Sequence, residues 1–299
     1  MEQPSTTASL TDAQLNPPEG AVIDLQRFRV AAEPAPVGRL VAFMGSKGGC
    51  GVTLLVVNLA AELASGSRVC VVDLAGSHGD VAAYLDLQCE RELSELIEFE
   101  HIDAGLLEAV ATKHRSGVAV LPQPTDLAET ALLDSDAVGR VLEASRLAYD
   151  IVLVDCDARL DEATLTTAMS ADIVALVFTP DVPAVRDANR ELRLLDRLGV
   201  DRDRVRLVLN QGSRRQQLSV AQIQDQLGRE VAAVVRADRS ACARCHLTGQ
   251  LLRELPGRHL IDEDICRLWP ALVGAPEQDQ PKRRRLASWL HTLLNVEVT

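Results

Sequence analysis

Aromatic residues are scarce in this sequence, because Phe, Tyr and Trp together make up only 3% of its 299 residues. Since 47% of the chain is nonetheless hydrophobic, the core must be built mainly from Ala, Val and Leu. Such a composition is typical of parallel sheets that are buried under helices. It favours an α/β fold, and the chain is long enough to bury a substantial core without help from disulfides.

The sequence also lacks an apolar run of membrane-spanning length and a secretory signal. Its first twenty residues, MEQPSTTASLTDAQLNPPEG, contain neither a basic segment nor an apolar one, so we expect a cytoplasmic protein. Lys and Arg number 31 against 43 acidic residues, and the net charge of −12 argues against a general nucleic-acid binder. Cysteines number seven, which is odd, and we interpret them as reduced thiols.

From residue 37 onward, short β-rich runs alternate with helical patterns such as TLLVVNLAAELA and VPAVRDANRELRLLDRLG. Because right-handed crossovers bring successive strands back in parallel, this alternation predicts a mostly parallel central sheet with helices on both faces. The predicted strands are RLVAFMG, SRVCVVDLA, GVAVLP, YDIVLVDC, ADIVALVFT, RVRLVLN and EVAAVVR.

Two polar segments flank this α/β region. Residues 1–36 carry five prolines and are interpreted as a flexible leader. The α/β domain is predicted over residues 37–275, followed by a linker and a basic amphipathic helix in residues 276–299. We expect the stretch 282–296 either to pack on the domain, to lie on an anionic inner-membrane surface, or to bind a protein partner.

A glycine-rich turn, FMGSKGGCGVT, lies between the first predicted strand and the first predicted helix. Its glycines allow positive φ and direct backbone N–H groups inward, and the following helix adds its positive dipole end. Parallel sheets bind ligands at this edge, so the turn predicts a phosphate site, although Val52 stands where such loops usually have lysine. A glycine-rich turn that binds nothing is the alternative. The predicted nucleotide-binding residues of the turn are Lys47, Gly48, Gly49, Cys50, Gly51, Val52 and Thr53.

The segment SKGGCGVT resembles the deviant Walker A motif of the MinD/ParA family, K-G-G-x-G-K-T. The resemblance covers about residues 38–255 and implies a P-loop NTPase fold of the SIMIBI type that binds ATP and Mg²⁺. It also implies a homodimer that forms on ATP binding, in which Lys47 acts on the partner's phosphates.

Three further segments carry the same resemblance in order: VCVVDLAGSHGDVAAYLDL, YDIVLVDCDA and LVLNQ. They imply that Asp73 and Asp155, together with Thr53, hold Mg²⁺ directly or through water. The resemblance also implies that Asn210 reads adenine, and that Lys47 and Asp155 support a weak catalytic activity.

Two departures from the family pattern concern hydrolysis. Val52 replaces the loop lysine, and Ala75 replaces the second aspartate of a D-x-D motif that is thought to orient the attacking water. Losing one charge-assisted contact costs about ten- to a hundredfold in affinity. Because phosphoryl transfer depends on positive charge and positioned water around the γ-phosphate, we expect ATP binding with very slow or absent turnover.

The lysine-less loop and the stretch GDVAAYLDL are similar to the CpaE/TadZ group of this family. That similarity implies a localisation and assembly scaffold for Flp (Tad) pili, which works with pilus and secretion assembly proteins at the inner membrane or cell pole. The alternative is an active MinD/ParA-like ATPase switch that positions division, flagellar or cargo machinery.

The stretch CARCH at 242–246 matches the C-x-x-C-H pattern of haem attachment, which would require export. Cys242, Cys245 and His246 are also competent ligands for zinc or an iron–sulfur cluster. Two helix-borne thiols without a special role are the remaining interpretation.

Overall fold

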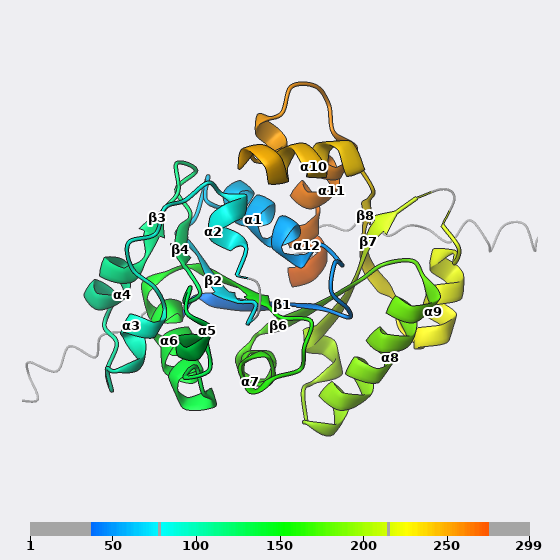
Figure 1. The fold of residues 1–299 in the computed structure, drawn as a ribbon. Coiled ribbons are helices and arrows are strands. Elements are labelled where there is room, and N and C mark those ends of the chain that lie inside the picture. Colours follow the sequence, from blue (N-terminus) through cyan, green and yellow to red (C-terminus); the bar gives the residue numbers. More distant parts are fainter. Residues whose placement is uncertain (1–36, 77–78, 214–215, 275–299) are drawn as a thin grey trace, which may run out of the picture. The chain divides into compact units, whose positions relative to one another are not determined.

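The computed structural model describes residues 37–76, 79–213 and 216–274. These residues belong to one compact unit that begins at Val37. Within them an eight-stranded sheet has the order β3-β4-β2-β5-β1-β6-β7-β8, and helices cover both of its faces (Figure 1). The predicted fold class is therefore confirmed.

The seven predicted strands are all present, and neighbouring members of this set pair in parallel. The short edge strand β3 (Thr112–Lys113) pairs antiparallel with its neighbour and was not predicted, because two residues are too few to show a pattern. The parallel strands are β1 (Arg39–Gly45), β2 (Val69–Leu74), β4 (Ala119–Leu121), β5 (Ile151–Cys156), β6 (Ile173–Phe178), β7 (Val205–Gly212) and β8 (Val231–Arg236).

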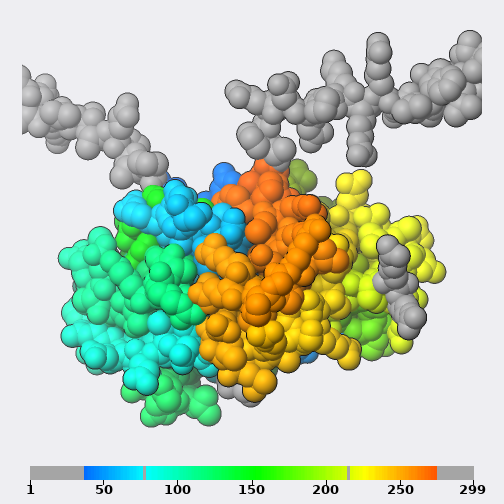
Figure 2. All heavy atoms as spheres, turned by 90° about the horizontal axis from the view of Figure 1, so that it is seen from above, coloured from blue at the N-terminus to red at the C-terminus, as the bar shows by residue number. Residues whose placement is uncertain are grey.

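One face of the sheet carries α1 (Val52–Leu63), α2 (Val81–Tyr84), α10 (Arg239–Thr248), α11 (Leu260–Cys266) and α12 (Leu268–Val273). Seen from above that face, the blue and cyan region of α1 and α2 lies beside the orange region of α10 and α11 (Figure 2). The other face carries α3 (Ser94–Ile97), α4 (Ala104–Val110), α5 (Leu127–Thr130), α6 (Ser135–Ala148), α7 (Glu162–Ser170), α8 (Val182–Arg197) and α9 (Val220–Leu227).

The core has two layers, one on each side of the sheet, because successive side chains of a strand point to opposite faces. In β1, Leu40, Ala42 and Met44 pack into the layer under α6, α7 and α8. Val41 and Phe43 pack into the layer under α1 and α11. Strands buried on both faces explain why their sequences read as continuous aliphatic runs.

Aspartate side chains begin most of the longer helices by accepting a hydrogen bond from a first-turn amide. Helix α1 differs, because its N-cap is Gly51 and no side chain bonds to its first turn. The amino end of α1 is therefore open to a ligand. The aspartate caps of α4, α6, α7, α8 and α10 are Asp103, Asp134, Asp161, Asp181 and Asp238.

In the described ranges 37–76, 79–213 and 216–274, no helix is long and apolar enough to cross a membrane. The predicted amphipathic helix within 276–299 lies outside these ranges, as does the predicted leader.

Glu191 on α8 provides a test of this packing. It is buried, its Oε2 has no hydrogen-bond partner among the described residues, and burial raises the pKa of its carboxyl to about 8. In the unfolded chain this group ionises at about pH 4.3, so its contribution to stability is fully present below that pH and is lost as pH rises toward the folded pKa.

We expect this loss to approach about 1.4 kcal/mol per pH unit between the two pKa values. Replacing Glu191 by Gln removes the titrating group, so urea unfolding of Glu191→Gln across that range is expected to give a flatter pH dependence. Parallel curves for the two proteins would contradict the raised pKa.

Candidate functional site

The turn between β1 and α1 has the backbone geometry of an anion-binding loop. Gly49 and Gly51 adopt left-handed φ values of 79° and 84°, which side-chain-bearing residues rarely take, whereas Gly48 does not. The chain then enters α1 with its first-turn amides uncapped. Free N–H groups and the positive end of the helix dipole both favour a bound phosphate at this point.

Two side chains at the end of β7 hold the turn in place. Asn210 Nδ2 donates to the Cys50 carbonyl at 2.7 Å, and Gln211 Nε2 donates to the Gly49 carbonyl at 3.2 Å. A Cβ at Gly51 would lie only 2.7 Å from Asn210 Nδ2, so this approach requires glycine.

Asn210 is buried, and its Oδ1 accepts from the Gln211 amide at 2.8 Å, so both ends of its side chain are engaged within the protein. Its predicted reading of adenine stays a prediction, while its observed contact supports the loop. Gln211 was not identified from the sequence; its positive φ of 58° and loop contact appear only in the structure.

Position 52 of the turn is apolar. Val52 is half-buried, and its Cγ2 lies 3.0 Å from the place where a Cβ on Gly45 would stand. The side chain therefore packs back against the end of β1, and it supplies no charge to the loop.

Lys47 forms an ion pair within the same chain. Its Nζ donates to both carboxyl oxygens of Asp181, at 2.9 and 2.8 Å. Burial alone would raise the pKa of Asp181, but hydrogen bonds from Lys47 and Thr179 hold it below its ordinary value. Asp181 also caps α8 through the Ala184 amide, so Lys47 is tied to a firmly positioned carboxylate.

Asp73 and Asp155 lie side by side at the ends of β2 and β5, where the parallel register pairs them directly. Both are 1% exposed. Burial raises the pKa of Asp73 to about 7, and burial together with the Asp73 charge raises the pKa of Asp155 well above its ordinary value. Two ionised carboxylates in this position repel each other unless a cation lies between or beside them.

Thr53 is the third residue that was predicted to hold Mg²⁺. Its hydroxyl approaches Asp155 and opposes the rise in that pKa, but both Asp155 oxygens remain without a well-directed hydrogen bond from any described residue. Asp73, in contrast, accepts from the amides of Ala75 and Val81 at 3.2 Å.

These residues fit a magnesium ion. Carboxylate and hydroxyl oxygens are its preferred ligands, and Mg²⁺ usually takes only one or two carboxylates and keeps several waters. The unpartnered Asp155 oxygens are the atoms that such an ion would neutralise. The charges of Asp80 and Asp157 add to the negative potential around Asp155.

The CARCH stretch lies on α10. Cys245 is buried, while the His246 ring makes an edge contact with Tyr84 at 5.1 Å between centroids. No group of three or more His, Cys, Asp or Glu side chains suited to a metal ion occurs anywhere in the described part of the chain. The interpretation as helix-borne thiols remains.

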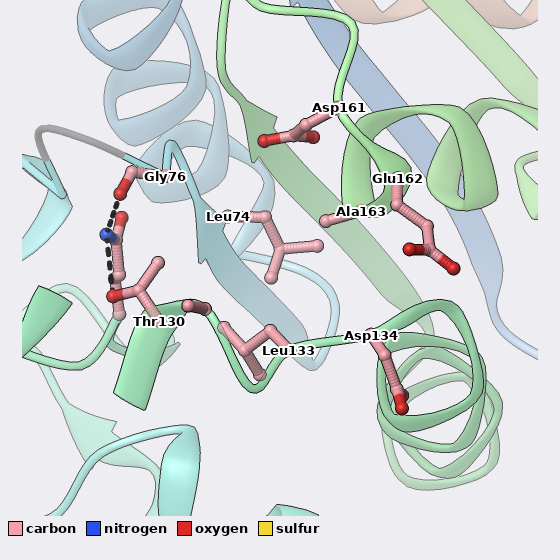
Figure 3. A pocket seen from close by; sticks show the side chains of 10 residues that line it. Leu74, Gly76, Thr130, Leu133, Asp134, Asp161, Glu162 and Ala163 are labelled. Carbon is pink, nitrogen blue, oxygen red and sulfur yellow. Dashed lines mark hydrogen bonds between the residues drawn. The ribbon is translucent and has the colours of Figure 1, made fainter. Parts of the chain in front are cut away.

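Two cavities adjoin the loop and the acidic pair. One of about 440 Å³ extends from Gly51 and Asn210 to Tyr84, Arg236 and Cys242, so it lies where a base attached to loop-bound phosphates would enter. The second, of about 230 Å³, is lined by residues at the end of β2 and at the starts of α6 and α7 (Figure 3). Its labelled acidic residues are Asp134, Asp161 and Glu162.

Comparison with known proteins identifies the family. The family model described as an AAA domain matches residues 38–198. The chain belongs to this AAA-domain family. Its relatives include the septum site-determining protein MinD of Thermotoga maritima, which is 23% identical over 67% of this chain and 75% of that protein. The chromosome-partitioning ATPase Soj of Thermus thermophilus is 34% identical over 46% of this chain and 53% of that protein.

Solved structures of the same type share the fold. A ParA family ATPase from Chlorobium tepidum superposes with a TM-score of 0.73 at 21% identity, covering 78% of this chain and 98% of that one. MinD of Pyrococcus horikoshii, complexed with Mg-ADP, gives 0.67 at 21% identity over 77% and 94%. The chain thus shares the fold of MinD and of a ParA family ATPase.

The acidic pair of this AAA-domain protein gives a prediction about metal. Because the ionised pair is costly near neutral pH, Asp155→Asn is expected to stabilise the metal-free protein. Mg²⁺ is expected to stabilise the unchanged protein and not the variant.

Thermal unfolding with and without millimolar Mg²⁺ measures both effects. Asp187→Asn, which changes an exposed aspartate of α8, is the control for loss of one negative charge. Equal stabilisation of Asp155→Asn and the unchanged protein by Mg²⁺ would show that the metal binds elsewhere.

Proposed function

We propose that this protein is a nucleotide-gated scaffold of the CpaE/TadZ type, which binds ATP and Mg²⁺ and assembles Flp (Tad) pili. The observation that carries the proposal is the open loop at α1, held by Asn210 and placed beside the Asp73–Asp155 pair. Backbone amides, together with Mg²⁺ held by the two aspartates, can bind a triphosphate even where the loop has no lysine side chain.

Two solved structures with this fold contain a nucleotide and magnesium, which supports the proposed ligands. MinD of Pyrococcus horikoshii was solved with Mg-ADP, and cobyrinic acid a,c-diamide synthase of Mycobacterium smegmatis with an ATP analogue and magnesium. The latter superposes with a TM-score of 0.59 at 22% identity, covering 79% of this chain and 94% of that one.

Weak hydrolysis follows from two positions. Val52 offers no charge to the β- and γ-phosphates, and Ala75 offers no carboxylate to an attacking water. Positive charge and positioned water supply most of the catalysis of phosphoryl transfer. ATP would therefore act by being bound, with Asp155 and Lys47 supporting at most a slow turnover.

Dimerisation would require Lys47 to change partners. In the isolated chain it is paired with Asp181, and the proposal assigns it to the phosphates of a second protomer once ATP is bound. The dimer surface would then recruit pilus and secretion assembly proteins. A complex of MinC with MinD of Aquifex aeolicus is a precedent for partner recruitment by this fold.

The second candidate is an active MinD/ParA-like ATPase switch that positions division, flagellar or cargo machinery. The MinD and Soj relatives favour it as much as the scaffold. In that case Lys47 would have to replace the missing loop lysine during turnover.

Equilibrium binding of a fluorescent ATP analogue tests the shared basis of both candidates. We expect saturable, Mg²⁺-dependent binding that Thr53→Ala weakens by about ten- to a hundredfold, because it removes the hydroxyl beside Asp155. Absence of binding by the unchanged protein at millimolar nucleotide would leave an interaction protein with a degenerate loop.

Steady-state phosphate release then separates the two candidates. For the scaffold we expect release near background and no effect of Lys47→Ala. Turnover that Lys47→Ala abolishes would establish the switch instead.

The segment 282–296 completes the proposal, although it lies outside the described residues. The basic and apolar residues of this predicted amphipathic helix suit an anionic inner-membrane surface. Binding there would place a cytoplasmic protein at the membrane or the cell pole.

Flotation with vesicles that contain anionic lipid tests the membrane assignment. We expect the full chain to float and a chain ending at Asp279 to remain at the bottom of the gradient. Equal flotation of the two chains would contradict the membrane role of residues 282–296, and flotation on neutral vesicles would exclude an electrostatic contribution.

A further inference from the structure

Arg159 lies in the loop between β5 and α7, four residues after Asp155. Its Nε and Nη2 are both 3.3 Å from Asp157 Oδ2, and its side chain is 68% exposed. The Asp157 side chain is only 15% exposed, but a pair of this length whose cation lies mostly in solvent contributes little to stability. The guanidinium is therefore held loosely.

The turn itself does not require this guanidinium. The Arg159 backbone amide donates to Asp157 Oδ1 at 3.0 Å, which fixes the turn through an aspartate side chain bonded two residues ahead. The backbone of Arg159 therefore holds the turn, and its guanidinium is available to bind another anion.

The guanidinium lies beside Gly76, in the segment that follows Asp73. A Cβ placed on Gly76 would lie 3.2 Å from Asp157 Oδ2 and 3.8 Å from Arg159 Nη2, and Gly76 follows Asp73 by three residues. Asp157 is near enough to Asp155 to raise its pKa. Because the Thr53 hydroxyl at the start of α1 approaches Asp155 as well, phosphates on the loop would point their distal end toward this group.

The loop also lacks the charge that a third phosphate needs. Val52 supplies none, and Lys47 is bound to Asp181 by two bonds of 2.8 and 2.9 Å. Arg159 makes two longer contacts of 3.3 Å, both to Asp157 Oδ2. Of these two cations, Arg159 is the one that a phosphate can draw away at lower cost.

We propose that Arg159 binds the terminal phosphate of the nucleotide and makes the site selective for triphosphates over diphosphates. This inference rests on the proposed nucleotide binding. The planar guanidinium donates two parallel N–H bonds to phosphate oxygens, a geometry that an ammonium group cannot reproduce. Leaving Asp157 for phosphate exchanges one anion for another, so Arg159 stays paired in both states.

Two variants and a matched control test the proposal. Arg159→Ala removes the charge, and Arg159→Lys keeps the charge but removes the fork. Arg190→Ala is the control, because Arg190 is also exposed and pairs with a nearby aspartate, Asp187, at 3.4 Å on α8. The probes are fluorescent ADP and a non-hydrolysable fluorescent ATP analogue, each with Mg²⁺.

We expect Arg159→Ala to lower the affinity for the ATP analogue by at least about tenfold and the affinity for ADP by less than about threefold. Arg159→Lys is expected to fall between, and Arg190→Ala to change neither affinity. Thermal unfolding of each variant checks the fold, and the ratio of the two affinities is unaffected by a reduced folded fraction.

Equal weakening of both nucleotides by Arg159→Ala, or no weakening, would overturn the assignment while nucleotide binding by the unchanged protein still stood. If Arg159→Ala does not fold, the ratio for Arg159→Lys decides, and an unchanged ratio refutes the proposal. Failure of the unchanged protein to bind either probe would remove the nucleotide function itself.

Discussion

Two carboxylic acids that are buried side by side impose the main electrostatic constraint on this structure. Asp73 and Asp155 are brought together by the register of two parallel strands, and each is almost fully buried. Each disfavours the ionised form of the other, and burial disfavours both. A cation beside them would favour the ionised form of both, which is why the proposed Mg²⁺ suits this edge of the sheet.

The same pair is linked to the backbone that follows β2. Asp73 accepts from the amides of Ala75 and Val81, so one carboxylate closes both ends of the intervening segment. Those bonds are strongest when Asp73 is ionised. Charge on Asp73 and the placement of these two amides therefore depend on each other, while the uncapped start of α1 supplies the complementary, positive side of the site.

Much of the fold followed from the sequence, because long aliphatic runs separated by amphipathic segments permit few architectures. The positions of Thr53, Asp73 and Asp155 at one sheet edge also followed from strand ends. The partners of the loop did not. Lys47 meets Asp181 from 134 residues away, and Asn210 meets the loop backbone from 160 residues away. Such contacts depend on how the helices that connect the strands pack together, and a local sequence pattern does not predict them.

Tyr84 links several parts of this arrangement. It ends α2, the short helix whose first amide is bonded to Asp73, and its ring lies against His246 of α10. The same side chain forms part of the wall of the 440 Å³ cavity. Tyr84 thus connects the helix that is bonded to Asp73 with α10 and with the wall of this cavity.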